Sequence, residues 1–326
     1  MDSFDGKLAV VTGGGSGMGR ELVRQLAAQG CSVAACDRNA GTVTETAAMA
    51  RDGAPGHVRV TGHTCDVSDE AQVLRFRDEL LQAHGSDHVD LVFSNAGIGG
   101  GESFVKSDRK IWEQVFATDW WGVYYCARAF LPLLIASGDG VLVNTSSVNG
   151  FWAALGPGMP NTAYSTAKFA VKGFSEALIE DLRSNAPQVR VAVVMPGHVG
   201  TDIIANSLRA RGLPEPEQMS DAQIDELIPA EARAGLTEAG LLAKDATVDD
   251  VRRFLVRMNA DFRDKAPLSA AAAAAIILDG VRSGAWRILV GDDAHKLDEM
   301  VRSTPEDAYD WAELIRRAEE AASAGT

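Results

Sequence analysis

The sequence predicts an α/β fold built on a doubly wound, parallel sheet of seven strands with helices on both faces. Two observations carry this prediction. Short apolar runs alternate with helix-length segments, and the runs are apolar throughout rather than at every second position. The alternation indicates parallel strands joined by right-handed helical crossovers. Continuous apolar character is typical of strands whose two faces are both covered.

The strand-like runs and the helical patterns can be placed in order along the chain. The expected strands are Lys7–Thr12, Ser32–Asp37, Val58–Thr64, Leu91–Asn95, Gly140–Ser146, Arg190–Met195 and Arg287–Val290. The expected helices between them include Gly19–Gln29, Glu70–His84, Lys110–Ala136, Ala163–Ser184 and Ser269–Ser283. Because the pattern continues to Val290, we expect a single domain over residues 1–326.

Two segments depart from the alternation. Residues 201–268 have no strand pattern and are rich in Ala, Glu, Asp and Leu, which predicts a helical insertion. Long connections inside compact domains are often lids or binding loops. Residues 292–326 are polar and form a C-terminal extension, with one helix expected around Glu306–Ala322. This extension either packs on a neighbouring subunit or frays.

Composition excludes several classes of partner. The chain has 326 residues with 31 basic and 45 acidic side chains, a formal net charge of −14, so nucleic acid and anionic membranes are disfavoured. No apolar run approaches the roughly 20 residues that cross a bilayer, and Met1–Gly6 has no leader pattern. The four cysteines lack metal-site spacing, which predicts reduced thiols, no metal and a cytoplasmic location.

A glycine-rich turn follows the first expected strand, in the segment Thr12–Gly19. Glycines let the backbone turn tightly and approach a pyrophosphate at the N-terminus of the following helix. Asp37 ends the second strand, where a carboxylate accepts hydrogen bonds from the adenosine ribose and repels a 2′-phosphate. Arg38 offers a neighbouring cation, but the turn itself carries Ser16 rather than Lys or Arg. The sequence therefore favours NAD over NADP.

Tyr164 and Lys168 lie four residues apart near the start of an expected helix, so both side chains share one helical face. Ser147 directly follows an expected strand, whose end faces the ligand crevice of a doubly wound sheet. A tyrosine exchanges a proton with an alcohol only if its pKa falls from about 10, and a nearby ammonium lowers it. A serine hydroxyl holds the oxygen where charge develops. These residue types predict hydride transfer between an alcohol and a ketone.

Taken together, these motifs resemble the short-chain dehydrogenase/reductase family in its compact subtype. Its other marks are Asp66-Val67, Asn95-Ala96-Gly97 and Pro196-Gly197, all in the expected order. The resemblance implies a Rossmann-type fold and an NAD-dependent oxidoreductase of CH–OH donors. The implied partner is a small-molecule alcohol or ketone. A homo-oligomer, dimer or tetramer, is also implied.

By the same resemblance, Tyr164 would be the general acid and base, and Ser147 would bind the substrate oxygen. Lys168 would hold the nicotinamide ribose and lower the tyrosine pKa. The cofactor would contact Gly13, Ser16, Gly17, Met18, Gly19, Asp37, Arg38, Asp66, Val67, Asn95, Ala96, Gly97, Tyr164, Lys168, Pro196, Gly197, Val199 and Thr201.

The chain departs from the family pattern at two places. Asp119 stands where the family has an asparagine that supports a water relay to the lysine. If that relay uses the backbone carbonyl, aspartate substitutes for it; if it uses the side-chain amide, proton supply changes or slows. Residues 150–160 lengthen the segment between Ser147 and Tyr164, and their apolar character predicts either an aromatic wall for substrate or a subunit contact.

The substrate is predicted to be a medium to large, mainly apolar secondary alcohol or ketone, because Ile203, Ile204 and Leu208 stand near the start of the proposed lid. The expected substrate-side residues are Ser147, Asn149, Phe151, Trp152 and His198. For His198, a loop-capping role is the equal alternative.

Two other functions stay open at this point. A reductase of carrier-bound 3-oxoacyl chains would prefer NADPH and a basic mouth, whereas residues 215–226 are acidic. A nucleotide-binding interaction protein with weakened turnover is supported by Asp119 and opposed by the intact Ser147, Tyr164 and Lys168.

Overall fold

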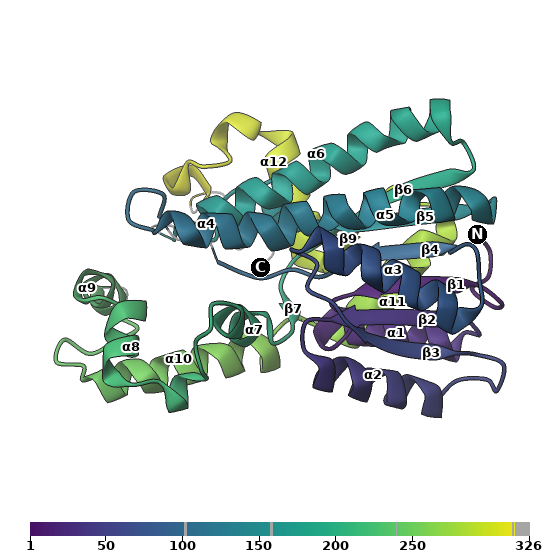
Figure 1. Cartoon of the computed structure of the whole chain (residues 1–326). Coiled ribbons are helices and arrows are strands. Elements are labelled where there is room, and N and C mark those ends of the chain that lie inside the picture. The colour runs from purple at the N-terminus through teal and green to yellow at the C-terminus, as the bar shows by residue number, and fades with distance from the viewer. Residues whose placement is uncertain (101–102, 157–158, 239, 315, 317–326) are drawn as a thin grey trace.

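The computed structural model describes residues 1–100, 103–156, 159–238, 240–314 and 316. Seven parallel strands form one sheet in the order β3-β2-β1-β4-β5-β6-β9, which confirms the predicted doubly wound arrangement (Figure 1). The strands are β1 (Leu8–Thr12), β2 (Ser32–Asp37), β3 (Val60–Thr64), β4 (Leu91–Ser94), β5 (Gly140–Thr145), β6 (Val189–Pro196) and β9 (Arg287–Val290).

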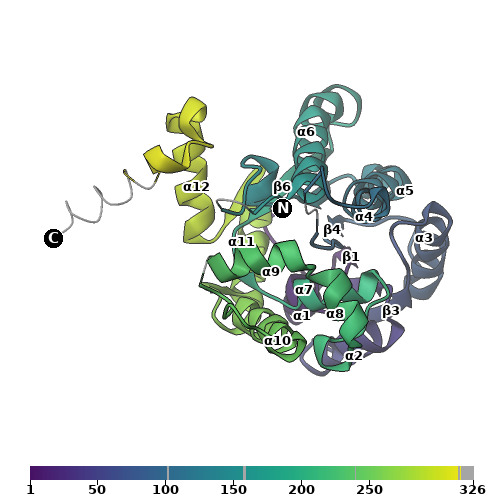
Figure 2. The same ribbon diagram turned by 90° about the vertical axis from the view of Figure 1, so that its left-hand side faces the viewer.

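Helices cover both faces of the sheet, and each face has its own buried apolar cluster (Figure 2). Successive residues of β1 point to opposite faces: Ala9 and Val11 join one cluster, whereas Leu8 and Val10 join the other. The first face packs against α1 (Gly17–Ala28), α2 (Ala40–Asp52) and α11 (Ala270–Ser283). The second packs against α3 (Glu70–His84), α5 (Gly122–Ser137) and α6 (Thr162–Asn185). This two-sided burial explains why the strands are apolar throughout.

The helix expected over Lys110–Ala136 is divided in the structure. It consists of α4 (Arg109–Phe116), a π-helical turn η1 (Ala117–Trp121) and α5. A π-turn inserts one residue into the helical ladder and rotates the side chains that follow it. The turn contains Asp119, whose side chain is completely buried.

Two further helices, one after β2 and one after β9, were not named in the sequence prediction. The helix α2 was not expected; Asn39 begins it by accepting hydrogen bonds from the amides of Gly41 and Thr42 at 3.0 and 3.2 Å. In the C-terminal extension, α12 (Asp292–Ser303) was likewise not expected. Of the helix expected near Glu306–Ala322, residues 311–314 and 316 are helical, and residues beyond 316 lie outside the described part of the chain.

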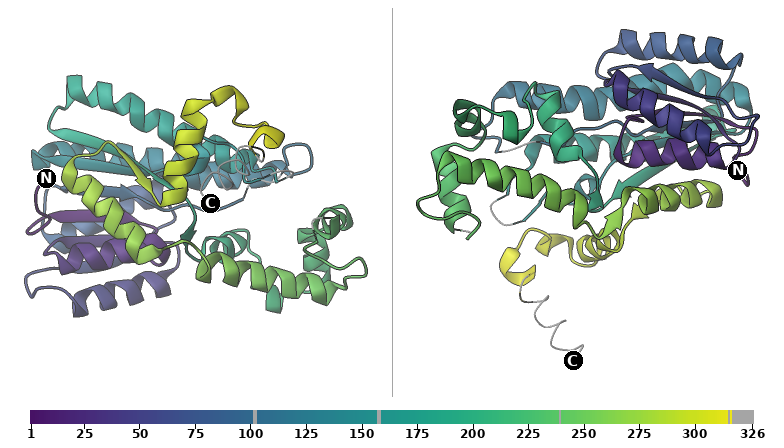
Figure 3. Two further views of the ribbon diagram at one scale, coloured as in Figure 1. Left: turned by 180° about the vertical axis from the view of Figure 1, so that it is seen from behind. Right: turned by 90° about the horizontal axis from the view of Figure 1, so that it is seen from below.

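Residues 201–268, which we call the insertion, form helices α7 (Ile203–Ala210), α8 (Asp221–Leu227), α9 (Ala230–Glu238) and α10 (Val248–Asp264). They project beyond the strand ends (Figures 1 and 3). The insertion has a buried cluster of its own, made of Leu208, Met219, Ile224, Leu242, Val251 and Leu255. At its base, β7 (Val199–Gly200) pairs in parallel with β8 (Leu268–Ser269). The predicted helical insertion is therefore present, and two short strands join its ends.

Among the described helices, none combines the length and apolar character that crossing a membrane requires. All four cysteines are buried and free of disulfides. The described residues contain no group of three His, Cys, Asp or Glu side chains arranged to hold a metal ion.

Candidate active site

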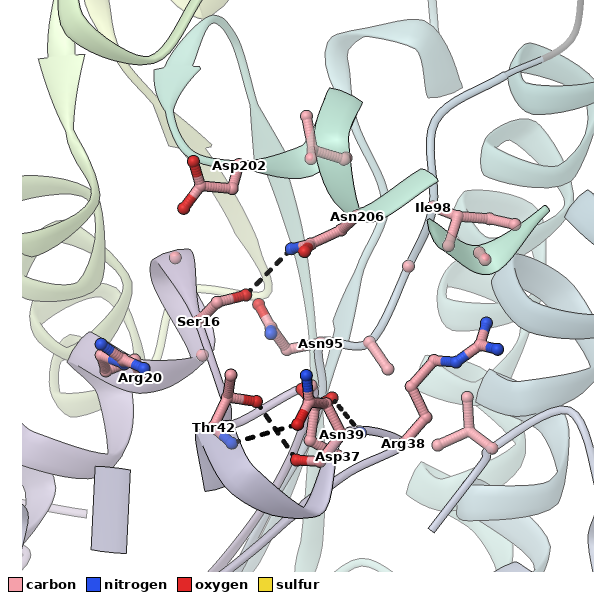
Figure 4. Close-up of a pocket in the computed structure, with 18 of the residues that line it drawn as sticks. Ser16, Arg20, Asp37, Arg38, Asn39, Thr42, Asn95, Ile98, Asp202 and Asn206 are labelled. Carbon is pink, nitrogen blue, oxygen red and sulfur yellow. Dashed lines mark hydrogen bonds between the residues drawn. The ribbon is translucent and has the colours of Figure 1, made fainter. Parts of the chain in front are cut away.

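A cavity of about 750 Å³ lies where β1, β2 and β4 end, on the edge where the sequence predicts the cofactor (Figure 4). Many of the predicted cofactor residues line it: Gly13, Ser16, Gly17, Met18, Gly19, Asp37, Arg38, Asp66, Val67, Asn95, Ala96, Gly97 and Thr201. Its size is within the range of about 300–1,000 Å³ that is usual for ligand pockets. The predicted residues Tyr164, Lys168, Pro196, Gly197 and Val199 lie outside this lining.

The glycine turn brings the backbone close to the cavity. A side chain on Gly19 would place its Cβ 2.0 Å from the carbonyl oxygen of Gly13, so a larger residue cannot be fitted without moving the turn. The amide groups of the first turn of α1 have no partner within the helix and face its N-terminus. Such amides, together with the helix dipole, bind anions such as phosphate.

Both carboxylate oxygens of Asp37 accept hydrogen bonds from nearby backbone amides. One oxygen accepts a hydrogen bond from Gly15 at 3.0 Å and the other accepts one from Asn39 at 3.0 Å. These bonds fix the carboxylate at the end of β2, on the cavity wall. Arg38 lines the same wall beside it (Figure 4). The site thus presents one anion and one cation to whatever occupies this end of the cavity.

The ends of β1 and β4 are tied together by Thr12 and Asn95. The Thr12 hydroxyl accepts hydrogen bonds from the amides of Asn95 and Ala96 at 3.0 and 3.1 Å. In return, the Asn95 amide group donates to the Thr12 carbonyl at 3.1 Å. Thr12 belongs to the motif but was not predicted as a site residue, and its contribution is to hold the cavity floor.

Asp119 and Lys168 meet behind the cavity floor. One oxygen of Asp119 accepts a hydrogen bond from the Ile98 amide at 2.9 Å and lies 3.8 Å from Lys168 Nζ. The other oxygen has no hydrogen-bond partner among the described residues. Lys168 Nζ also donates to the carbonyl of Thr145 at 3.2 Å. Gly97 lines the cavity beside this pair: a Cβ on it would lie 2.8 Å from the Asp119 oxygen and 3.3 Å from Lys168 Nζ.

The environment of Asp119 favours its neutral form. Burial raises the pKa of this carboxyl to about 6, although Lys168 and the Ile98 amide act in the opposite direction. Lys168 therefore faces a carboxyl that gains or loses its charge near neutral pH. The Asp119 side chain thus lies beside Lys168, and the choice between a relay through its backbone carbonyl and one through its side chain stays a prediction.

Tyr164 lies one helical turn before Lys168 on α6, and Lys168 Nζ is 5.4 Å from the centre of its ring. Burial raises the pKa of the Tyr164 phenol above its ordinary value. The Lys168 ammonium lowers that pKa, the Asp119 carboxyl raises it, and a hydrogen bond with Ser147 lowers it. The lysine acts in the predicted direction, but the sequence did not reveal that burial outweighs it in this protein.

An apolar cluster surrounds the tyrosine. Tyr164 packs with Ile98 and with Trp112 and Phe116 of α4, and Ala210 of the insertion joins the same group. The Trp112 and Phe116 rings stack with centres 5.6 Å apart. The wall beside the phenol is therefore mainly hydrocarbon.

Two of the predicted substrate-side residues, Asn149 and Phe151, contact other parts of the chain. Asn149 donates from its amide nitrogen to the carbonyls of Trp152 and Ala154 at 3.0 and 2.9 Å, so it shapes the loop that it begins. Phe151 lies over Arg287, at 5.7 Å from ring centre to guanidinium carbon. Part of this loop, residues 157–158, lies outside the described residues.

His198 and Thr201 flank the base of the insertion. The His198 ring is 2.8 Å from the carbonyl oxygen of Phe262 at the end of α10, which corresponds to the loop-holding alternative. Thr201 lies against Gly17 of the glycine turn. A direct contact of His198 with substrate stays a prediction.

Sequence reasoning missed the polar contacts that the insertion makes with the cavity. Asn206 donates to the Ser16 hydroxyl at 3.1 Å (Figure 4), and Ser207 accepts from the Gly99 amide at 2.7 Å. Asn206 and Arg209 also line the cavity. No local pattern marks these residues, because each contact joins segments about 100 or more positions apart.

Comparison with known proteins gives a consistent result. The short chain dehydrogenase family profile matches residues 7–212. A Mycobacterium tuberculosis protein named SadH, described as a candidate oxidoreductase, is 38% identical over 212 residues, covering 65% of this chain and 74% of that protein.

Solved structures also resemble the chain, one of them over nearly its whole length. A short-chain dehydrogenase/reductase from Burkholderia phymatum in complex with NAD has a TM-score of 0.72 and 28% identity, over 94% of this chain and 95% of that one. A metagenomic short-chain oxidoreductase in complex with NADP has a TM-score of 0.53 and 29% identity, over 60% of this chain and 83% of that one. The neighbours thus include complexes with either dinucleotide.

Proposed function

The chain belongs to the short-chain dehydrogenase family, and from this premise we propose that it interconverts a secondary alcohol and a ketone with NAD. The observation that carries the proposal is the convergence of Ser147, Tyr164 and Lys168. Ser147 is hydrogen-bonded to the Tyr164 phenol, and Lys168 Nζ lies 5.4 Å from the centre of the Tyr164 ring. Lys168 also lies next to the cavity, because a Cβ on Gly97 would be 3.3 Å from its Nζ. A proton-transfer group beside a dinucleotide site is what alcohol oxidation requires.

The residues present fit a dinucleotide. The amides at the start of α1 suit the pyrophosphate, and the absence of a side chain on Gly19 lets the Gly13 carbonyl approach closely, so that the turn stays tight. Asp37 suits the adenosine ribose, and Asp66 and Val67 line the cavity where the adenine is expected. When bound, the cofactor supplies the hydride acceptor or donor.

Tyr164 supplies the proton chemistry. In the direction of ketone reduction, the phenol gives its proton to the substrate oxygen; in the direction of alcohol oxidation, it takes that proton back. The Ser147 hydroxyl holds the same oxygen, and donates a hydrogen bond where negative charge develops. Lys168 lowers the pKa of the phenol against the effect of burial. The apolar cluster around Tyr164 keeps bulk water from competing for the proton.

An apolar substrate is supported by the surroundings of the phenol. Ile98, Trp112, Phe116 and Ala210 form a hydrocarbon wall beside Tyr164, and Ile203 lines the cavity nearby. Leu208, in contrast, is buried inside the insertion. We therefore propose that the insertion covers the substrate as a lid through α7, whose contacts with Ser16 and Gly99 bring it over the cavity.

NAD is proposed over NADP because Asp37 presents a carboxylate at the place where NADP carries an additional phosphate. Arg38, which lines the wall beside Asp37, is a cation that would favour NADP. Comparison of kcat/KM for the two cofactors tests this choice. A higher kcat/KM with NADPH than with NADH would show that the Asp37 carboxylate does not exclude the additional phosphate.

A homo-oligomer through α5 and α6 is also proposed. Trp121 is 44% exposed although it belongs to an aromatic cluster with Trp120, Tyr124 and Tyr125, and Phe169 of α6 is 41% exposed. Large exposed aromatic side chains are typical of protein interfaces. Sedimentation velocity would detect the dimer or tetramer.

The test of the proposed function is the absorbance of NADH at 340 nm. Purified protein is assayed with NAD and secondary alcohols of increasing apolar size, and with NADH and the matching ketones. We expect turnover that increases with apolar size. Binding of the dinucleotide without turnover of any alcohol or ketone would instead support the interaction protein with weakened catalysis.

A further inference from the structure

We propose that the C-terminal extension is the positioning element of the substrate side. In this inference, residues 292–311 fix the loop that follows Ser147 and the turn that follows β6, and thereby set which substrates reach Tyr164. The inference rests on the proposed function and adds a specificity role for a segment that lies outside residues 7–212, the part matched by the family profile.

The first contact joins the extension to the loop after Ser147. The Trp152 indole donates to the carbonyl of Ala308 at 2.7 Å, and the amide of Ala153 donates to the Tyr309 hydroxyl at 3.0 Å. The rings of Trp152 and Trp311 are 5.7 Å apart. Two hydrogen bonds and one ring contact therefore hold residues 308–311 of the extension against two adjacent loop residues.

The second contact holds Phe151 through Arg287 and α12. Its ring lies over Arg287, whose guanidinium forms a two-pronged ion pair with Asp298 of α12. Both partners are largely buried, with 14% and 13% of their side chains exposed. Arg302 binds the same carboxylate at 2.9 Å. An arginine held in this way is a rigid platform for the aromatic ring.

The third contact reaches the turn after β6. Asp293, in the first turn of α12, accepts a hydrogen bond from the His198 amide at 2.6 Å. Its carboxylate occupies the space beside Gly197, where a Cβ would lie 2.2 Å from either oxygen. The His198 ring is in turn bound to the end of α10. One segment therefore contacts the loop after β5, the turn after β6 and, through His198, the insertion.

The loop keeps its internal shape without the extension, because Asn149 holds the carbonyls of Trp152 and Ala154. What the extension adds is the position of that loop relative to Ser147 and Tyr164. Loss of the contacts at Trp152 and Tyr309 should therefore change substrate affinity and selectivity. The affinity for NAD should be kept, because neither residue lines the cavity at β1, β2 and β4.

The test uses the full chain with Trp152→Phe, Tyr309→Phe and the double variant. Tyr309→Phe keeps the ring and removes one hydrogen bond. Trp152→Phe removes the indole N–H donor and leaves a smaller aromatic ring in its place. Trp286→Phe is the matched control. This tryptophan is 46% exposed, lies just before β9, and makes none of the three contacts described above. We expect KM for a large ketone to rise roughly two- to tenfold for each bond removed. The change for a small ketone should be less, kcat should change little, and Kd for NADH should stay within about twofold.

Hydrogen exchange of residues 146–156 provides a readout that does not depend on turnover. We expect faster exchange in that segment for the double variant, and unchanged exchange in the glycine turn and in the control. Faster exchange in a protein that turns over no ketone would leave the positioning role standing and sink the proposed function. Unchanged exchange and unchanged selectivity in an active enzyme would overturn the inference.

Discussion

The two sides of the strand ends are built differently. Around β1, β2 and β4, the wall is built mainly at the strand ends, where Thr12 is bound to Asn95, and the insertion adds Asn206 and Arg209 to it. Around β5, β6 and β9, the connections are long and are held by side chains distant in sequence, such as Trp152 bound to Ala308. The first side is suited to binding the dinucleotide cofactor that members of a family share. The second can change by mutation without disturbing the first, which is how one fold accommodates different substrates.

The largest expected effect separates chemistry from binding. Tyr164→Phe removes the proton that the substrate oxygen exchanges, so kcat should fall by about 10²–10⁴-fold. Kd for NADH should stay nearly unchanged, because the ring remains in its apolar cluster. Steady-state rates at 340 nm and a fluorescence titration with NADH measure the two quantities. Tyr124→Phe on α5 is the control and should retain the activity of the unaltered protein; retention of most activity by the Tyr164 variant would end the acid–base assignment.

Core truncations test whether the insertion is a separate cooperative unit. Ile224→Ala in the insertion and Leu142→Ala in β5 each remove a fully buried side chain, and each should cost about 2–5 kcal/mol within its own unit. We expect the Leu142 variant to lower the midpoint of global urea unfolding. The Ile224 variant should mainly accelerate hydrogen exchange over residues 203–264. An equal loss of global stability in both would show that the insertion unfolds with the sheet.

Asp119 lies between the two sides, and its pKa makes stability depend on pH. Because this pKa is raised from the ordinary 3.8 to about 6, the folded protein holds the proton more tightly than the unfolded chain. Stability therefore falls as pH rises from about 4 to about 6, by an amount on the order of 3 kcal/mol, and the penalty remains above that pH.

Asp119→Asn should remove this part of the pH dependence. Urea unfolding of both proteins at about pH 4, 5, 6 and 7 measures the difference in the free energy of unfolding. The variant also loses the negative charge that raises the pKa of Tyr164, so the pH profile of alcohol oxidation should move to lower pH. A stability difference that is constant over this pH range would mean that Asp119 is ionised throughout.

The smallest effect concerns the glycine turn alone. Gly19→Ala places a Cβ 2.0 Å from the Gly13 carbonyl oxygen, so the turn that holds the pyrophosphate must shift. If the cost of about 1–3 kcal/mol typical of overpacking falls on cofactor binding, Kd for NADH rises roughly 5- to 150-fold. KM for the ketone at saturating NADH should change little. Gly173→Ala on α6 is the control, because its Cβ would meet nothing within 4 Å and should leave NADH binding unchanged. Equal effects on cofactor and ketone would contradict the separation of the two sides.

Local patterns predicted the framework well. All seven sheet strands were placed within about two residues, and α3 was placed at its observed bounds, because Asp69 caps its start and Gly85 ends it in the left-handed region at φ 63°. The spacing of Tyr164 and Lys168 likewise follows from helix geometry. The π-turn at Ala117–Trp121, which contains the buried Asp119, was missed, since the hydrophobic periodicity predicts one unbroken helix over this segment.

The sequence by itself determined the doubly wound sheet, the glycine turn and the side chains available for proton transfer, because each of these rests on periodicity or spacing within a short segment. Only the tertiary structure decided the raised pKa of Asp119, the reach of Asn206 to Ser16 and the docking of Tyr309 on Ala153. Those features depend on burial and on contacts between residues as much as 190 positions apart. No local pattern encodes such contacts, since they exist only once the chain has folded.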